Sequence, residues 1–294
     1  MTANSRAVLW IISSCFLFSS MNALAKLLFA TGTLGGLHPL QVTFARYVFA
    51  AAALLPFAFR EARFPSKAMF VRYAVRVLGG YFGVVFMFLA LEKMRLSDAT
   101  AIGFTSPFFA IALAALLLGE RPDRRRWLAA VIGFVGVLVI TRPSGSTVEP
   151  AALFALLAAF AMGIEIVGVK WVSEVDKPTV VILLSNLLAV PLGAVAAAPV
   201  WIAPSASQWL LLVAIGVVAA VGQQCVLRGA RLGEASFIAP FFYFSLVFAT
   251  LLGAVIFNEV PPLSTLIGSA IIFVGVLLPA EPRLAPLLRG KLRE

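Results

Sequence analysis

The chain has 294 residues, of which 62% are hydrophobic and only 12% are charged, and its formal net charge is +10. A soluble domain of this size carries about twice that charged fraction, because polar side chains must cover its surface. The composition therefore excludes a soluble globular protein and predicts an all-α membrane protein. The two cysteines are too few for a disulfide-rich secreted domain.

Apolar runs close to the roughly 20 residues that cross the hydrocarbon core follow one another along the chain. They predict ten transmembrane helices joined by short connections. In chain order the predicted spans are 7–30, 39–59, 70–92, 97–119, 126–142, 151–173, 178–201, 207–230, 235–257 and 262–279.

The second half of the chain repeats the first in degraded form. The segment FTSPFFAIALAALLLGERP at 104–122 recurs as FSLVFATLLGAVIFNEVP at 244–261. Aligning Glu120 with Glu259 leaves the rest of the repeat in register, apart from small gaps. Because each copy holds five spans, an odd number, the second copy must enter the membrane from the opposite side. Such an inverted repeat is typical of secondary transporters.

The repeat divides the chain into three parts. We predict a first five-helix repeat at 1–145, a second, inverted repeat at 146–281, and a basic cytoplasmic tail at 282–294. The two repeats are expected to enclose a central cavity.

Lys and Arg collect in connections that share one side of the predicted membrane, and the positive-inside rule assigns this side to the cytoplasm. These residues are Arg6, Arg60, Arg63, Lys67, Arg72, Arg121, Arg124, Arg125, Arg126, Lys170, Lys177, Arg228, Arg231, Arg283, Arg289, Lys291 and Arg293. Only Lys93, Arg95 and Arg142 fall outside, and Lys26, Arg46 and Arg76 lie within spans. The net charge therefore predicts both termini in the cytoplasm and a lipid bilayer as partner, and not nucleic-acid binding.

Motifs for reaction chemistry are absent from the sequence. There is no GxxxxGK[ST] loop for ATP, no HExxH or CxxC, and no GxSxG around a serine nucleophile. His38 is the only histidine, while Cys15 and Cys225 lie in apolar spans, so a metal site lacks its usual ligands. We expect neither an enzyme nor a bound cofactor.

Polar side chains inside spans are the candidate site residues, because they are costly in hydrocarbon and face the bundle interior. In the first span, Cys15, Ser19, Asn22 and Lys26 follow helical spacing and share one face. Asn22 either lines a cavity or makes interhelical hydrogen bonds. Lys26 either lines the cavity or extends to the lipid headgroups.

Arg46 lies two helical turns after Pro39, and the second copy has Ser185 at the equivalent position. The scaffold itself therefore does not require an arginine there. A planar guanidinium suits a carboxylate or a backbone carbonyl. Substrate contact and a buried tether to a broken helix end both stay open.

Glu165 is the one acid placed well inside a predicted span, the sixth. It is expected to pair with Lys26 or Lys170, to bind a substrate ammonium, or to carry a coupling proton. We retain Glu165 as the candidate coupling residue, with a static ion pair as the alternative.

Further cavity candidates are spread over the other spans. They are Tyr81, Phe104, Asn186, Gln223, Gln224, Tyr243 and Phe244. Tyr243 stands out because its hydroxyl needs a partner and Pro240 lies one turn away. The fifth and tenth spans instead carry small residues, among them Gly136 and Gly268, which favour close helix packing.

The two LLLGERP and IFNEVP endings, the Pro39 to Arg46 opening of the second span and the inverted repeat resemble EamA-type members of the drug/metabolite transporter superfamily. The chain is also similar to the YddG-like amino-acid exporters within it. The resemblance implies a ten-helix bundle with a central cavity, alternating access, and export from a bacterial cytoplasm. It also implies amino acids, including aromatic ones, and small organic cations as cargo.

The second copy departs from the first at the helix break. It has Leu246 where the first has Pro107, and its proline is displaced to Pro240. This difference predicts that the two halves break their helices at different depths.

Glu120 and Glu259 end equivalent helices in the two copies. The inversion predicts Glu120 at the cytoplasmic face beside Arg124 to Arg126, and Glu259 at the outer face without a basic neighbour. We interpret both acids as structural.

The leading functional hypothesis is a secondary transporter in the bacterial inner membrane that exports amino acids with broad specificity. The alternatives are a carrier of drugs, organic cations or nucleotide sugars, and a non-transporting membrane sensor or assembly subunit.

Overall fold

The computed structural model describes residues 3–29, 35–58, 67–118, 124–141, 150–173, 178–232 and 239–277. The predicted tail at 282–294, together with Glu120 and the side chain of Lys170, lies outside the described residues. In chain order the elements are α1 (Ala3–Phe29), α2 (Pro39–Ala58), α3 (Lys67–Lys93), α4 (Leu96–Gly103), α5 (Ser106–Leu118), α6 (Arg124–Thr141), α7 (Pro150–Ser173), α8 (Pro178–Ala197), η1 (Ala198–Val200), α9 (Ala206–Leu232), η2 (Ala239–Tyr243), α11 (Phe244–Phe257) and α12 (Leu263–Leu277).

The helices lie where the apolar runs predict them. Among the residues that the structure describes, seven stretches are long and apolar enough to cross a membrane, and shorter apolar helices occupy 130–140, 241–257 and 263–275. Prolines open α2, α7 and α8, at the first helical position, where the missing N–H is not needed for the helix. The predicted all-α membrane fold of ten spans is confirmed.

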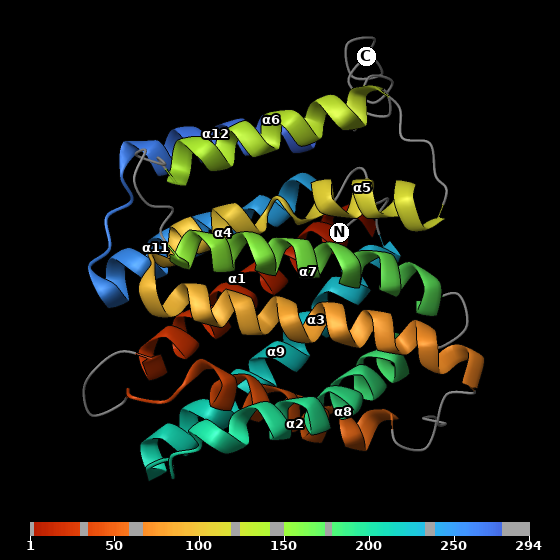
Figure 1. Ribbon diagram of the computed structural model, residues 1–294, viewed down its shortest axis with the longest axis vertical. Helices are drawn as coiled ribbons and strands as arrows, with labels where there is room; N and C mark the ends of the chain where they lie inside the picture. Colours follow the sequence, from red (N-terminus) through yellow and green to blue (C-terminus); the bar gives the residue numbers. More distant parts are fainter. Residues whose placement is uncertain are drawn as a thin grey trace.

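The two halves of the bundle run in opposite directions. Lys26 near the end of α1, Lys93 at the end of α3 and Ile140 near the end of α6 surround one cavity together with Ala152 at the beginning of α7. The first helices of the two copies, α1 and α7, are therefore antiparallel, as an inverted repeat requires. We call this end of the bundle the Lys26 end, and the opposite end, where α1 begins, the Arg6 end. In Figure 1 the helices run across the view.

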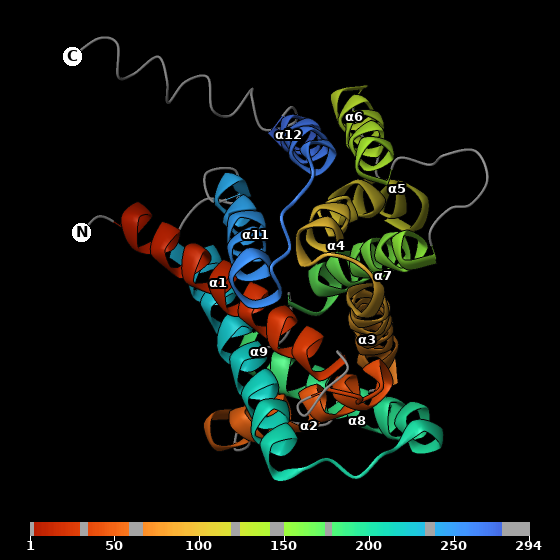
Figure 2. The same cartoon turned by 90° about the vertical axis from the view of Figure 1, so that its left-hand side faces the viewer.

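Equivalent helices make equivalent interfaces. α1 packs along α9 and α3 packs along α7, while α2 packs on α8 and α6 on α12. Figure 2 looks along the bundle from the Lys26 end: α1, α9 and α11 form one side, α3, α4, α5 and α7 form the other, and the α2–α8 and α6–α12 pairs close the two edges.

Glycines permit the closest of these contacts. A Cβ on Gly79 of α3 would lie 2.5 Å from the backbone nitrogen of Glu165 in α7. A Cβ on Gly136 of α6 would lie 2.7 Å from the carbonyl oxygen of Gly268 in α12, and the reverse distance is 2.6 Å. The predicted close packing of the fifth and tenth spans through small residues is confirmed.

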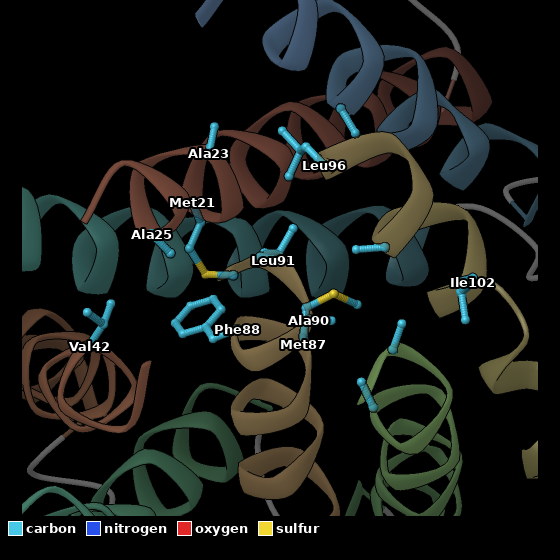
Figure 3. Close-up of a cluster of buried hydrophobic side chains, with 14 of the residues drawn as sticks. Met21, Ala23, Ala25, Val42, Met87, Phe88, Ala90, Leu91, Leu96 and Ile102 are labelled. Carbon is cyan, nitrogen blue, oxygen red and sulfur yellow. The ribbon is translucent and has the colours of Figure 1, made fainter. Parts of the chain in front are cut away.

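An apolar core seals the interior of the bundle near the Lys26 end. Side chains of α1, α2, α3 and α4 converge there, and Met21 from α1 meets Phe88 and Leu91 from α3 (Figure 3). Phe88 and Leu91 have no exposed surface, and Phe29 packs against Phe88 with ring centroids 5.6 Å apart.

The fourth and ninth spans are both interrupted. The first interruption lies at Phe104, between α4 and α5, and the second at Tyr243, where η2 gives way to α11. The offset that aligns Glu120 with Glu259 also aligns these two residues. The second copy is 3-10 helical from Ala239 to Tyr243, however, whereas the first copy stays α-helical as far as Gly103. The difference in depth between the two helix breaks therefore stays a prediction.

Candidate substrate site

The two broken helices touch at their interruptions. The rings of Phe104 and Tyr243 stack with centroids 4.5 Å apart and an interplanar angle of 12°. Because the repeat equates these residues, their contact straddles the pseudo-two-fold axis between the two halves. The ring of Phe273 packs edge-on against Tyr243 at 4.6 Å, and the Tyr243 hydroxyl donates to the carbonyl of Ile272 at 3.4 Å.

The polar face of α1 points at the second broken helix. The Ser19 hydroxyl donates to the carbonyl of Ser245 at 2.9 Å, and the Cys15 thiol lies 3.5 Å from the carbonyl of Phe242. One turn after Ser19, the buried Oδ1 of Asn22 has no hydrogen-bond partner among the described residues. The prediction that these side chains share one inward face is confirmed.

Lys26 ends this face and makes an ion pair with Glu259 across the bundle. Its ammonium also donates to the carbonyl of Met94 at 2.6 Å, while Glu259 Oε2 accepts from the backbone N–H of Leu96 at 3.0 Å. Asn258 adopts the left-handed conformation (φ 54°) that ends α11, and the Glu259 N–H then bonds back to the carbonyl of Gly253. This turn places the Glu259 carboxylate in reach of α1.

The expectation that Glu259 has no basic neighbour was therefore wrong. Lys26 is distant in sequence but close in space, and its side chain lines a cavity at this end of the bundle.

Arg46 is buried in α2 with only 4% of its surface exposed. Its guanidinium lies over the ring of Tyr47, 4.4 Å from the centroid. Nε and Nη1 have no hydrogen-bond partner among the described residues, and the described ion pairs do not include Arg46. Thr43, one turn earlier, also has a buried hydroxyl without a described partner. Two of its three guanidinium nitrogens are therefore free to donate to a further partner.

Glu165 faces Arg76 of α3. The Arg76 Nη2 lies 4.0 Å from Glu165 Oε1, and its Nε donates to the hydroxyl of Ser185 in α8 at 2.8 Å. Gly80 leaves room for the carboxylate, since a Cβ there would lie 3.1 Å from Glu165 Cδ. The expected pairing of Glu165 with Lys26 is not found, because Lys26 is engaged by Glu259.

The amide candidates lie between α8 and α9. The Asn186 amide donates to the carbonyl of Ile182 at 2.8 Å and to Gln223 Oε1 at 3.4 Å. Asn186 Oδ1 and Gln224 Nε2 are buried without described partners. These two unpaired groups remain available to a ligand.

Two further candidates fall in different places. The centroid of the Tyr81 ring lies 5.8 Å from that of Tyr47, whose ring also contacts Arg46, so Tyr81 lies near Arg46. Phe244 is 40% exposed and packs against Phe248 and Phe241, so the structure does not bring it to the other candidates.

Four residues at these positions were not singled out from the sequence as site residues: Tyr47, Arg76, Ser185 and Glu259. Arg76 carried a usable signal, since it is a charge within an apolar run and so needs a buried partner. The contact of Glu259 with Lys26 carried no local signal, because it joins residues from opposite halves of the chain.

An inverted repeat with two broken helices that meet on its axis, and with buried polar groups on the surrounding helices, defines a secondary transporter. The chain belongs to the EamA-like transporter family, whose pattern matches it twice, at residues 5–142 and 149–279. It is a multi-pass membrane transporter of small metabolites and not an enzyme.

Several curated relatives resemble the chain over nearly its whole length. An S-adenosylmethionine uptake transporter of Rickettsia bellii is 30% identical over 91% of both chains. A riboflavin transporter of Vibrio cholerae is 28% identical over 92% of this chain and 91% of the relative. A pseudopaline exporter of Pseudomonas aeruginosa is 30% identical over 92% and 94%, respectively. None of these three is an amino-acid exporter by name, so the narrower resemblance to YddG-like proteins stays a prediction.

A crystal structure of a protein 23% identical to this chain aligns with a TM-score of 0.64, over 99% of this chain and 100% of the other. This likeness supports the fold alone.

Proposed function

We propose that this protein moves small metabolites bearing an amino-acid group across the bacterial cytoplasmic membrane by alternating access. In this proposal Arg46 binds the carboxylate of the cargo. Amino acids and S-adenosylmethionine share that carboxylate and its neighbouring ammonium group.

The observation that carries the proposal is that two nitrogens of the buried Arg46 guanidinium, Nε and Nη1, lack hydrogen-bond partners among the described residues. A charge without a partner inside a membrane protein is strongly unfavourable, and such residues mark substrate or ion pathways. In this proposal the cargo carboxylate accepts a charge-assisted hydrogen bond from one of the two guanidinium nitrogens, Nε and Nη1, that lack partners. Substrate binding then supplies the missing counter-charge.

The cargo's side chain has a different neighbour in this proposal. The stacked rings of Phe104 and Tyr243 offer flat apolar faces to aromatic or adenine groups. The ability to bind side chains loosely while fixing the carboxylate favours broad specificity. Outward transport is part of the proposal, and the relatives, named as uptake transporters and as an exporter, make direction a quantity to measure.

A second candidate cargo is a flat, uncharged heteroaromatic molecule such as riboflavin. The aromatic contact on the pseudo-two-fold axis and the similarity to riboflavin transporters favour it. Riboflavin has no carboxylate, so its transport should not depend on Arg46. The two cargo classes are therefore separable with one substitution.

The test is flux into proteoliposomes of radiolabelled phenylalanine, methionine, S-adenosylmethionine and riboflavin, with wild type, Arg46→Gln, Arg46→Lys and the exposed control Arg231→Gln. We expect Arg46→Gln to lower kcat/KM for the three zwitterions about thirtyfold or more, because a buried charge pair loses one partner. Arg46→Lys should retain part of the wild-type kcat/KM, because it keeps the positive charge. The kcat/KM of Arg231→Gln should equal that of the wild type.

Unchanged zwitterion flux in Arg46→Gln would refute the assigned role of Arg46. Saturable riboflavin flux with no zwitterion flux in the wild type would select the second candidate.

A further inference from the structure

A polar cavity of about 540 Å³ lies at the Lys26 end of the bundle, apart from Arg46. Its volume is within the range of small-molecule sites. Charged side chains of both signs line it: Lys26, Lys93 and Arg95 are basic, and Glu92, Asp98 and Glu259 are acidic. Because basic and acidic side chains are equal in number, the cavity favours neither an anion nor a cation. It suits a zwitterion, which carries one charge of each sign.

The charges in this cavity differ in burial. Lys93 is paired with Glu92 at 3.1 Å, but its side chain is 69% exposed, so this pair lies on the rim. The Lys26 and Glu259 side chains are only 13% and 19% exposed. Exposed charges on the rim contribute little to binding, whereas removing one partner of a buried charge pair is costly, so the Lys26–Glu259 pair is the part of the cavity to which a ligand's charges matter most.

Backbone groups hold both members of the buried ion pair in place. The carbonyl of Met94 accepts from Lys26, and the N–H of Leu96 donates to Glu259. Both groups belong to the junction between α3 and α4, so the ion pair joins α1, α11 and this junction. The Asp98 carboxylate also accepts a hydrogen bond from the hydroxyl of Thr265 in α12 at 2.6 Å.

We propose that this cavity is a second binding site, selective for zwitterions, in which the ligand's carboxylate takes the place of Glu259 on Lys26 and its ammonium takes the place of Lys26 on Glu259. The ligand replaces one buried ion pair with two, so the charges stay compensated while the direct link between α1 and α11 is released. Only a zwitterion can do both. The ligand class rests on the proposed function, but the site itself does not involve Arg46.

Ligand binding at this site is measured through the reactivity of a cysteine introduced among the residues that line the cavity. Met94→Cys is introduced after Cys15→Ala and Cys225→Ala, and alkylation by a maleimide is timed in detergent-solubilised protein. The probes are methionine, methionine methyl ester, which lacks the carboxylate, and N-acetylmethionine, which lacks the ammonium.

We expect methionine to slow the alkylation in a saturable way and the two derivatives to have no effect. Lys26→Met or Glu259→Gln should weaken this protection about tenfold or more, because each leaves one ligand charge without its partner. Lys26→Arg should retain it, which separates loss of charge from misfolding. Arg46→Gln should retain it as well.

Equal protection by the ester and the N-acetyl derivative would overturn selectivity for zwitterions. Absence of protection by methionine in a protein that transports it would overturn the site while leaving the proposed function intact. Protection of the wild-type background by methionine, in a protein that transports no zwitterion, would uphold the site and refute the proposed function.

Discussion

Lys26, Arg46 and Arg76 are basic side chains within the helices, and each has a different arrangement of partners. Lys26 has a carboxylate and a carbonyl, and Arg76 has Ser185 with Glu165 at the edge of ion-pair distance. Arg46 has an aromatic ring but two unpaired nitrogens. Since desolvating a charge is costly, the least compensated of the three is the one best suited to meet a charged cargo.

Glu165 stays our candidate for proton coupling. Its side chain is 31% exposed, and Arg76 Nη2 lies 4.0 Å from its carboxylate. We expect Glu165→Gln to keep exchange of labelled for unlabelled substrate and to lose the response of net flux to an imposed pH gradient, because glutamine carries no exchangeable charge. The measurement is proteoliposome flux with and without the gradient.

A wild type that shows no gradient response, or a Glu165→Gln variant that keeps it, would remove Glu165 from the coupling mechanism. The variant assayed without a gradient serves as its own control for folding and substrate binding.

At the scale of elements, the sequence predicted the spans closely, because a helix that crosses lipid needs a continuous apolar run whatever its neighbours are. Local chemistry also indicated that one face of α1 points inward and that α6 and α12 pack closely. The contact of Lys26 with Glu259, and that of Arg76 with Ser185, could not be predicted. They depend on which helices become neighbours, and no short-range pattern in this chain encodes that.

The crossing of α3 over α7 depends on Gly79. A Cβ there would lie 2.5 Å from the Glu165 nitrogen and 2.9 Å from the Ala161 carbonyl oxygen, which are backbone atoms that cannot move aside. We expect Gly79→Ala to lower the unfolding temperature in detergent by several degrees, since forcing the helices apart costs about 1–3 kcal/mol. Thermal unfolding followed by size-exclusion chromatography measures it.

Gly222→Ala in α9 is the matched control. There a Cβ would meet only the Phe18 ring at 3.3 Å and other side-chain atoms, which can shift slightly. Alanine is the better helix former by about 1 kcal/mol, so this variant should be neutral or slightly stabilised. If Gly79→Ala is as stable as Gly222→Ala, the close crossing is not needed for the fold.

At the scale of the whole molecule, the pseudo-two-fold symmetry is incomplete. α1 with α9 and α3 with α7 form matching interfaces, as do α1 with α11 and α7 with α5. α2, however, packs extensively along α9, whereas its counterpart α8 has few contacts with α3. In the proposed alternating-access cycle, this unequal packing corresponds to one state, and exchanging the unequal contacts between the two halves would generate the other. In the present state the Lys26–Glu259 pair holds the Lys26 end together.

The orientation of this cycle in the membrane follows from charge. At the Arg6 end, described residues include Arg6, Arg124 and the exposed Arg231, whereas Lys26, Lys93 and Arg95 line the cavity at the Lys26 end. Together with the further Lys and Arg residues that the sequence assigns to the Arg6 end, the positive-inside rule leads us to expect this end in the cytoplasm. In a cysteine-free background, we expect Glu92→Cys to react with a membrane-impermeant maleimide in intact cells and Arg231→Cys to react only after permeabilisation.

Labelling in permeabilised cells controls for the intrinsic reactivity of each thiol, because both positions are then open to the reagent. The reverse pattern would place the Lys26 end in the cytoplasm. The proposed zwitterion site would then face the cytoplasm. The Lys26–Glu259 pair would hold the cytoplasmic end of the bundle together, and an opening in this state would face the outside. The labelling pattern therefore decides whether the cavity at the Lys26 end is the last site that an exported molecule meets or the first.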